Sequence, residues 1–427
     1  MLSIKKRSLC QVLNLYIIIM SLALNFLQDF LRFPSFIKYT LDLALVMVLV
    51  CMIFEGKQFA IHKKVAPMVA FIAAYIIYVS IVYLFEYQSI FYFLWGIRNN
   101  LRYYIAFMAF VYFFDRDDVK LCTKLFDVTF ALHIAVSFFQ FFALGYKQDY
   151  LGGIFGVQLG CNGNSMMLML IACIKSLIMY MYGKETLAAT IAKCALSLVV
   201  AAMAELKFFF VLFLLILIGA AMITKFSWKK VSIIASAALA VFIASNIFTA
   251  IWGENAALSI ERVIKLITST SYSSSIDLGR FTAIPVISDT IMTDTWKRLF
   301  GLGLGNCDTS AFEICNTPFY RTHSYLNYNW FSSAFSFIET GYFGVLFSLS
   351  FFVIIFVCAM QLKKKHNSNV EYCDIAAIAA ATCVALFFYN SSLRTDIAYI
   401  IFFVLALPFV SESSESMRQK RVARAEI

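Results

Sequence analysis

Long apolar runs separated by short polar segments make up most of the chain. The runs lack the period-two alternation of barrel strands, and backbone groups in hydrocarbon must bond within their own segment, so the pattern predicts membrane-spanning helices. We therefore expect an all-α polytopic membrane protein with about 12 transmembrane helices. The predicted spans are 9–29, 36–54, 65–85, 90–114, 122–145, 163–182, 187–205, 208–224, 231–251, 341–361, 373–390 and 396–410.

Basic residues fall in every second connection between these runs, which by the positive-inside rule makes those connections cytoplasmic. Both termini are then cytoplasmic, and the long segment between spans 9 and 10 is exoplasmic, which in a Gram-negative cell means periplasmic. The expected parts are 1–251 (spans 1 to 9), 252–340 (a periplasmic loop domain with short helices), 341–411 (spans 10 to 12) and 412–427 (a basic cytoplasmic tail).

Composition excludes several classes of protein. The chain has 427 residues, of which 62% are hydrophobic and 14% are charged. Soluble globular domains have more charged and fewer hydrophobic residues than this. Its net charge of +10 comes from scattered clusters that set topology, so no nucleic-acid partner is expected. The eleven cysteines show no metal-ligand spacing, and we expect no metal and no cofactor. Cys307 and Cys315 lie close enough in sequence for a loop-closing disulfide in an oxidising compartment, and the sequence leaves that pairing open.

Residues 277–341 form the largest polar stretch and are the candidate active site. Asp277 is expected to cap a helix beginning near residue 278, which would put Arg280 in its first turn beside free N–H groups that favour an anion. His323 and Glu339 would lie about 24 Å apart on one unbroken helix, so the chain must turn between them if both serve one site. The same stretch contains Arg321.

Charged residues within the spans supply further candidates. Arg98 and Arg102 share one helical face in the fourth run, where we expect a polar cavity and a partner of opposite charge. Their paired donors suit a phosphate or diphosphate. The alternative is that both side chains reach to the membrane interface. Glu205 and Lys207 form a tight exoplasmic turn, either as ligand contacts or as turn residues. Asn162 or Asn164 either hydrogen-bonds a ligand hydroxyl or simply begins the sixth span.

The cationic residues, His323 and Glu339 all fall on the predicted outer face, where they suit an anionic lipid head group. ATP is absent there, so a transfer reaction needs an activated donor that is already attached to lipid. The order DLGR, WKRLFGLGLG, RTHSYL and ETGYFG within 277–345 resembles the O-antigen ligase and Wzy-type O-antigen or capsule polymerase superfamily. Weaker similarities are RNNLR at 98–102, the asparagines near 162–164 and ELK at 205–207.

This resemblance implies a metal-independent glycosyltransferase of the bacterial inner membrane that uses undecaprenyl-diphosphate-linked oligosaccharide. Arg280, Arg98 and Arg102 would hold the diphosphate, His323 would assist the incoming hydroxyl, and Arg321 would join the phosphate clamp. We expect Glu339 to be catalytic, and Lys207, Asn164 and Glu205 to contact diphosphate or glycan. The leading function is surface-polysaccharide polymerase, with a chain-length regulator as a potential partner. The alternatives are the ligase that moves glycan to lipid A-core and, from another class, a lipid-linked oligosaccharide flippase. Ser324 stands where the ligase branch often has Asn.

Overall fold

A computed structural model describes residues 7–54, 65–86, 89–224, 227–253, 260–271, 277–309, 313, 316–365 and 369–410. These residues form helices and connecting loops without a strand. The longer helices are α1 (Leu9–Asp29), α2 (Tyr39–Phe54), α3 (Ala66–Glu86), α4 (Ile90–Phe113), α5 (Arg116–Phe142), α6 (Asn162–Met181), α7 (Leu187–Met203), α8 (Lys207–Ile223), α9 (Trp228–Trp252), α14 (Ser332–Lys365) and α15 (Val370–Tyr389). Short α-helices are α10 (Ile260–Thr268), α11 (Ala283–Thr290), α12 (Thr295–Phe300) and α13 (Pro318–His323).

The all-α prediction is confirmed for the described residues, and a helix occupies each of the twelve predicted ranges. Among the described residues, eight helices are long and apolar enough to cross a membrane, and α7, α8 and the helix Ala398–Val410 are apolar but shorter. Helix α4, which carries Arg98 and Arg102 and occupies the fourth predicted range, is in neither of these two groups. The predicted tail at 412–427 lies outside the described residues.

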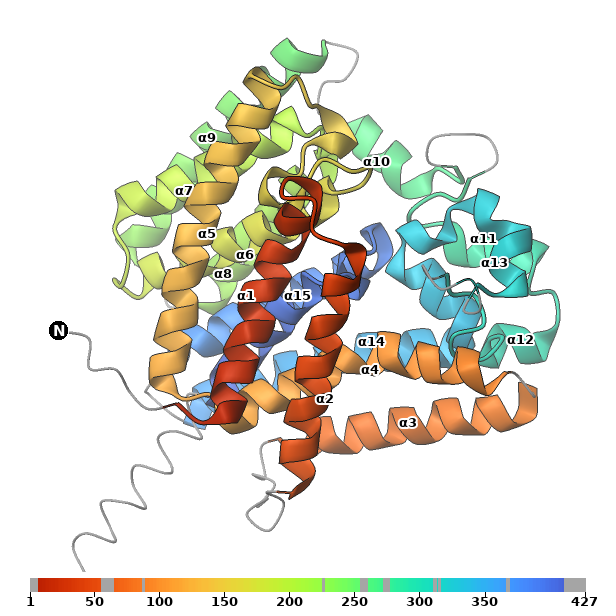
Figure 1. Cartoon of the computed structure of the whole chain (residues 1–427). Coiled ribbons are helices and arrows are strands. Elements are labelled where there is room, and N and C mark those ends of the chain that lie inside the picture. The colour runs from red at the N-terminus through yellow and green to blue at the C-terminus, as the bar shows by residue number, and fades with distance from the viewer. Residues whose placement is uncertain are drawn as a thin grey trace, which may run out of the picture.

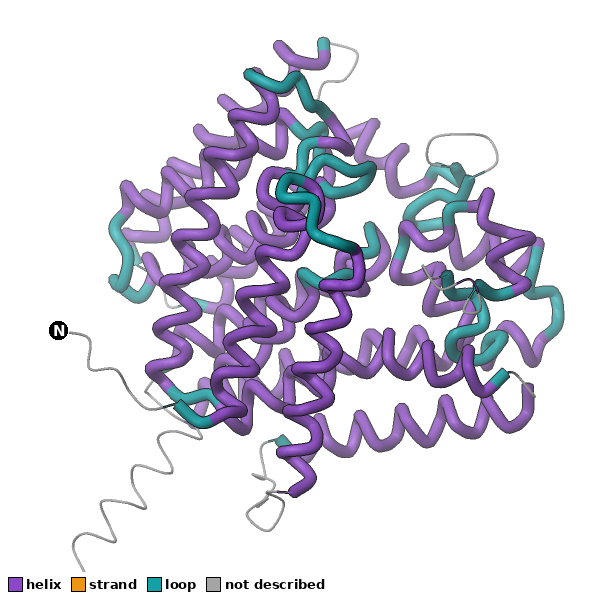
Figure 2. Tube along the Cα trace, viewed as in Figure 1, coloured by secondary structure: helices purple, strands orange, loops and turns teal. Residues whose placement is uncertain are grey.

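The apolar helices pack around a shared core. Helix α14 packs against α15 and α3, and α7 packs against α6 and α9. In Figure 1, α3, α4 and α14 run at a large angle to α1, α2 and α5, and the short helices α10 to α13 gather on one side. Figure 2 shows several of the longer loop segments on that side.

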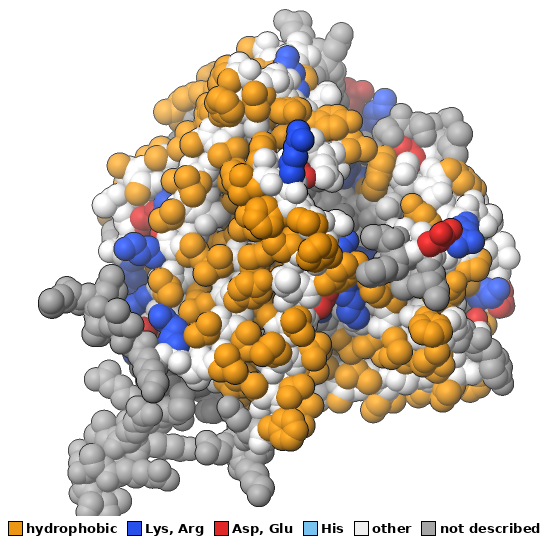
Figure 3. Space-filling model, viewed as in Figure 1, with side chains coloured by type: hydrophobic (Ala, Val, Ile, Leu, Met, Phe, Trp, Pro, Cys, Tyr) orange, Lys and Arg blue, Asp and Glu red, His pale blue; other side chains and the backbone are white. Residues whose placement is uncertain are grey.

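Hydrophobic side chains also cover the outside of the bundle. Figure 3 shows them over most of the face formed by α1, α2 and α5. Leu43, Ile53 and Phe139 are each at least 60% exposed. Such a continuous apolar surface is unusual for a protein in water and is what a lipid-facing wall requires. The protein is therefore an all-α protein that associates with a lipid bilayer.

The helix ends that carry basic residues are joined by ion pairs. Lys184, just after α6, pairs with Glu371 at the start of α15, and Lys363 near the end of α14 lies 2.7 Å from Asp374. Lys363 also donates to the backbone oxygen of Ile223 at the end of α8 (2.7 Å). These four helix ends therefore lie together at one end of the bundle.

One predicted helix boundary needs correction, and a second coincides with a kink. The helix expected from Leu278 begins at Ala283, so Arg280 lies in a turn before it. The preceding segment is bonded elsewhere, because the N–H of Leu278 donates to Leu326 (3.3 Å) and that of Gly279 to Thr270 (2.8 Å). The tenth span is expected from residue 341, and α14, which begins at residue 332, has a non-helical kink at Gly341 (φ 61°), so the helical stretch after the kink begins next to the expected start.

Candidate functional site

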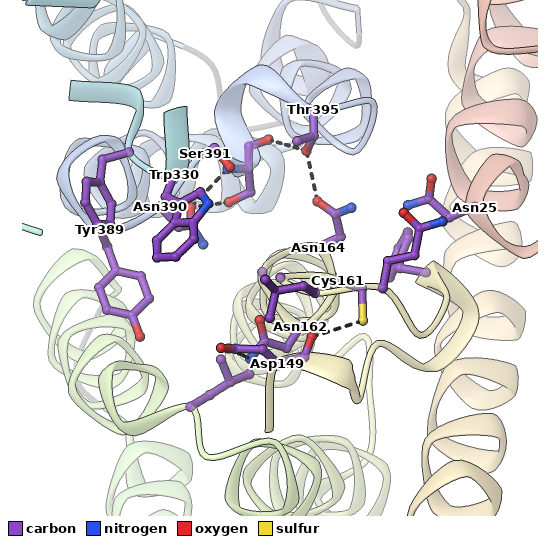
Figure 4. Close-up of a pocket in the computed structure, with 18 of the residues that line it drawn as sticks. Asn25, Asp149, Cys161, Asn162, Asn164, Trp330, Tyr389, Asn390, Ser391 and Thr395 are labelled. Carbon is purple, nitrogen blue, oxygen red and sulfur yellow. Dashed lines mark hydrogen bonds between the residues drawn. The ribbon is translucent and has the colours of Figure 1, made fainter. Parts of the chain in front are cut away.

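Two adjoining cavities lie where the loops meet the bundle. The first, of about 340 Å³, is lined by six amide side chains, three carboxylates and one guanidinium, and we call it the amide cavity (Figure 4). The second, of about 370 Å³, is lined by four cationic side chains and two carboxylates, and we call it the arginine cavity. Four residues line both and so join them: Asn25, Asn164, Ser391 and Thr395.

The sequence-predicted pair Arg98 and Arg102 lines the arginine cavity. Arg98 forms an ion pair with Asp42 of α2, and its guanidinium lies 4.7 Å from the centre of the Trp95 ring. Arg102 lies 3.2 Å from Asp396. Both arginines thus face a polar cavity and an opposite charge, as expected, while their predicted role in binding a diphosphate stays a prediction.

Sequence reasoning missed Arg394, which lines the same cavity. It stands between the last two apolar helices, and its guanidinium lies 3.0 Å from the centre of the Phe335 ring. Lys38 is the fourth cation, and Asp308 of the long loop accepts a hydrogen bond from Asn99 of α4. A charged residue in the short connection SSLRTD was the available signal for Arg394, by the same logic that selected Arg98.

Asparagines at the start of α6 line the amide cavity. Oδ1 of Asn164 accepts a hydrogen bond from Thr395 (2.9 Å), and Nδ2 of Asn162 donates to Asp149 (2.9 Å), as Figure 4 shows. Cys161 precedes them, and burial, reinforced by Asp29 and Asp149, raises the pKa of its thiol to about 12. This wall of the cavity is therefore polar, and its thiol is protonated at neutral pH.

Glu205 and Lys207 form the predicted tight turn. Glu205 adopts a left-handed backbone conformation (φ 55°) and lies 3.1 Å from Lys207. Its carboxylate also accepts a hydrogen bond from Gln148 (2.6 Å). Glu205 lines the amide cavity, whereas the side chain of Lys207 lines neither cavity.

Arg280 lines the amide cavity and not the arginine cavity. Its Nη1 donates to the backbone oxygen of Tyr389 (2.8 Å), and its guanidinium lies 4.2 Å from the centre of that ring. The structure therefore brings Arg280 into a cavity that adjoins the one holding Arg98 and Arg102, through the residues shared by both.

Within the described part of the chain, His323 and Arg321 line neither cavity. His323 ends α13 and its ring stacks on Phe319, with centres 4.5 Å apart. Arg321 is exposed on the same short helix. Asn327 makes the turn that was expected between His323 and Glu339, with φ at 53°. The predicted roles of His323 and Arg321 stay predictions.

Glu339 is buried and holds the GLGLG segment in place. Its Oε1 accepts a hydrogen bond from the N–H of Gly305 (2.7 Å), its backbone oxygen accepts one from Gly303 (2.9 Å), and its Oε2 accepts one from Asn100 (3.3 Å). A Cβ at Gly305 would overlap the backbone of Tyr92 and Gly96 in α4. The glycines therefore allow close approach between the loop and α4. Glu339 lines neither cavity, and its predicted catalytic role stays a prediction.

The sequence also left open a disulfide between Cys307 and Cys315, and it predicted no metal site. Cys307 is buried, and burial raises the pKa of its thiol. Cys315, its candidate disulfide partner, lies outside the described residues. In the described ranges, no three His, Cys, Asp or Glu side chains are placed to hold a metal ion.

No protein-family model matches the chain, and no curated protein matches it.

Proposed function

We propose that the protein is a surface-polysaccharide polymerase of the bacterial inner membrane. It would join undecaprenyl-diphosphate-linked oligosaccharide repeat units at the periplasmic face, with twelve spans and both termini in the cytoplasm. The observation that carries this proposal is the cavity with three arginines that adjoins a cavity lined by six amide side chains.

The position of the cavities along the helices supports the proposed topology. Helix α6 begins at Asn162 in the amide cavity, and Lys184 follows its other end. Helix α15 begins beside Glu371, the partner of Lys184, and is followed by Asn390 in the amide cavity. Each helix has 20 residues, about 30 Å at 1.5 Å per residue, which matches the hydrocarbon thickness. The cavities and the basic helix ends thus lie at opposite ends of these helices.

The chemistry of the cavities fits a glycan on a diphosphate carrier. Guanidinium groups bind phosphate oxygens through paired N–H donors and stabilise the charge that develops on a leaving diphosphate. In the proposed reaction, a hydroxyl of the acceptor glycan attacks the anomeric carbon of the donor. The bond from that carbon to the phosphate oxygen breaks, and undecaprenyl diphosphate leaves with the electron pair. The hydroxyl proton passes to a base, for which His323 is the proposed residue.

A strain that lacks the gene tests the proposal. We expect it to lose polymer while single repeat units still reach the surface lipid. Loss of all attached glycan would instead indicate the ligase. Build-up of lipid-linked units in the cytoplasm would indicate the flippase. Complementation by the intact gene, and not by an empty vector, must restore the chain-length distribution.

A further inference from the structure

The two cavities differ in the kind of group that they can bind. The arginine cavity has an excess of cations, whereas the carboxylates of the amide cavity are already bonded to neighbours. Asp149 accepts from Asn162 (2.9 Å), and Asp29 accepts from the N–H of Val157 (3.1 Å) and from Gln158 (2.6 Å). Polar groups of this kind, beside apolar rings, suit a neutral ligand rich in hydrogen-bonding oxygens.

The side-chain amide of Asn390 presents an unused hydrogen-bond donor in the amide cavity. Asn390 is only 8% exposed, and its Nδ2 has no hydrogen-bond partner among the described residues. The orientation of the amide is fixed, because Oδ1 accepts the backbone N–H of Ser392 (3.1 Å). Nδ2 is therefore a buried donor. A buried donor without an acceptor costs about 1–3 kcal/mol, so such a group calls for a ligand or another explanation.

The free donor faces the start of α6. A Cβ built at Gly163 would lie 3.4 Å from Nδ2 of Asn390, and both residues line the amide cavity. Gly163 therefore leaves space beside the donor. Trp330 and Tyr389 also line the cavity, and Figure 4 shows both residues beside Asn390. Flat aromatic faces next to amide donors provide both contact area and hydrogen bonds for a sugar ring.

We propose that the amide cavity is the subsite for the neutral sugar attached to the diphosphate carrier, and that Nδ2 of Asn390 donates a hydrogen bond to an oxygen of this sugar. This inference rests on the proposed function. With the diphosphate in the arginine cavity, the shared residues Asn164 and Thr395 mark the passage through which its sugar reaches the amide cavity.

Binding measurements on the purified full-length protein in lipid nanodiscs test the subsite. The two probes are undecaprenyl diphosphate and the lipid-linked single repeat unit extracted from the strain without the gene. We expect the intact protein to bind the glycosylated probe more tightly than the bare carrier. Gly163→Ala would place a methyl group over the donor, and Asn390→Ala would remove the donor. Each change should weaken binding of the glycosylated probe by about fivefold to tenfold, the value of one hydrogen bond, and leave the bare carrier within twofold.

Gly219→Ala is the matched control. It also adds a methyl group inside a helix, in ordinary contact with Ile378 (3.8 Å) and away from both cavities, so binding of either probe should not change. Unchanged binding of the glycosylated probe by Gly163→Ala or Asn390→Ala would overturn the subsite, as would an equal loss for both probes. Failure of the intact protein to bind either probe would instead overturn the proposed function, so the two failures are distinguishable.

Discussion

The backbone N–H of Gly305 donates a 2.7 Å hydrogen bond to the buried carboxylate of Glu339. Thirty-four positions separate the two residues, so this bond ties the glycine-rich loop to the first part of α14. Together with the hydrogen bond from Asn100, it joins the long loop, α4 and α14. Asp308 of the loop and Arg98 and Arg102 of α4, which line the arginine cavity, belong to the segments that meet at that junction.

Glu339→Gln separates support of the loop from chemistry. The substituted amide keeps one oxygen that can accept from Gly305 and loses the 3.3 Å bond from Asn100, so we expect a smaller loss of stability than in Glu339→Ala. Glu339→Ala leaves a buried N–H unsatisfied and should cost about 1–3 kcal/mol. Thermal unfolding in detergent and polymer length on gels measure the two effects. Chain extension by Glu339→Gln would argue against proton transfer by this residue, and its loss in a stable protein would support the predicted catalytic role.

Gly305→Ala should prevent stable folding. Its φ is 85°, and an added Cβ would overlap the carbonyl oxygen of Tyr92. Gly145 is the matched control, because its φ is 74° but nothing lies near its Cβ position. Gly145→Ala should therefore cost only the backbone strain of about 1–2 kcal/mol. Size-exclusion chromatography of fluorescent fusions compares them, and equal monomer yields would contradict the close approach of loop and helix.

Arg98→Lys tests the paired donors of the arginine cavity. Lysine keeps the positive charge beside Asp42, so the protein should fold, but it cannot offer two parallel N–H groups to a phosphate. We expect chain extension to fall by about 100-fold, the scale seen when one preorganised donor is removed. Lys120→Gln is the control, since its side chain is 74% exposed and its ion pair with Asp117 lies at the surface. Normal extension by Arg98→Lys at normal protein levels would count against the diphosphate role.

His323→Ala and His323→Phe together test the proposed base. Phenylalanine can keep the stack on Phe319 but cannot accept a proton, so both variants should lose chain extension by at least about 100-fold. Membrane-inserted protein should stay at the normal level, as judged by immunoblot. Extension by His323→Phe, with loss in His323→Ala, would assign the ring a packing role only.

Cysteine labelling tests the proposed topology. Trp296→Cys lies in α12 and should react with a membrane-impermeant maleimide added outside, whereas Lys120→Cys should react only after the membrane is opened. The native Cys161 should react slowly in either case, because its raised pKa keeps the thiol protonated at pH 7. Labelling of both positions from the same side would contradict the twelve-span arrangement.

Local pattern was sufficient for the long apolar helices and insufficient for the site. Helix α1 has the predicted limits, and α6 begins one residue before the predicted start, because apolar run length is a local property. The partner of Arg98 could be predicted as a carboxylate but not as Asp42, since the two residues belong to different spans. The role of the GLGLG glycines depends on Gly96 and α4, a contact that no local spacing encodes.

The carboxylates Asp42 and Asp396 beside the arginines have a consequence for turnover. A diphosphate that binds there would have to displace Asp42 from Arg98 and Asp396 from Arg102. Each aspartate would therefore compete with the diphosphate for the guanidinium group that it contacts. Such competition lowers affinity at equilibrium. In the proposed reaction it would also give each arginine a carboxylate partner again when undecaprenyl diphosphate departs, so that release need not leave an unpaired charge.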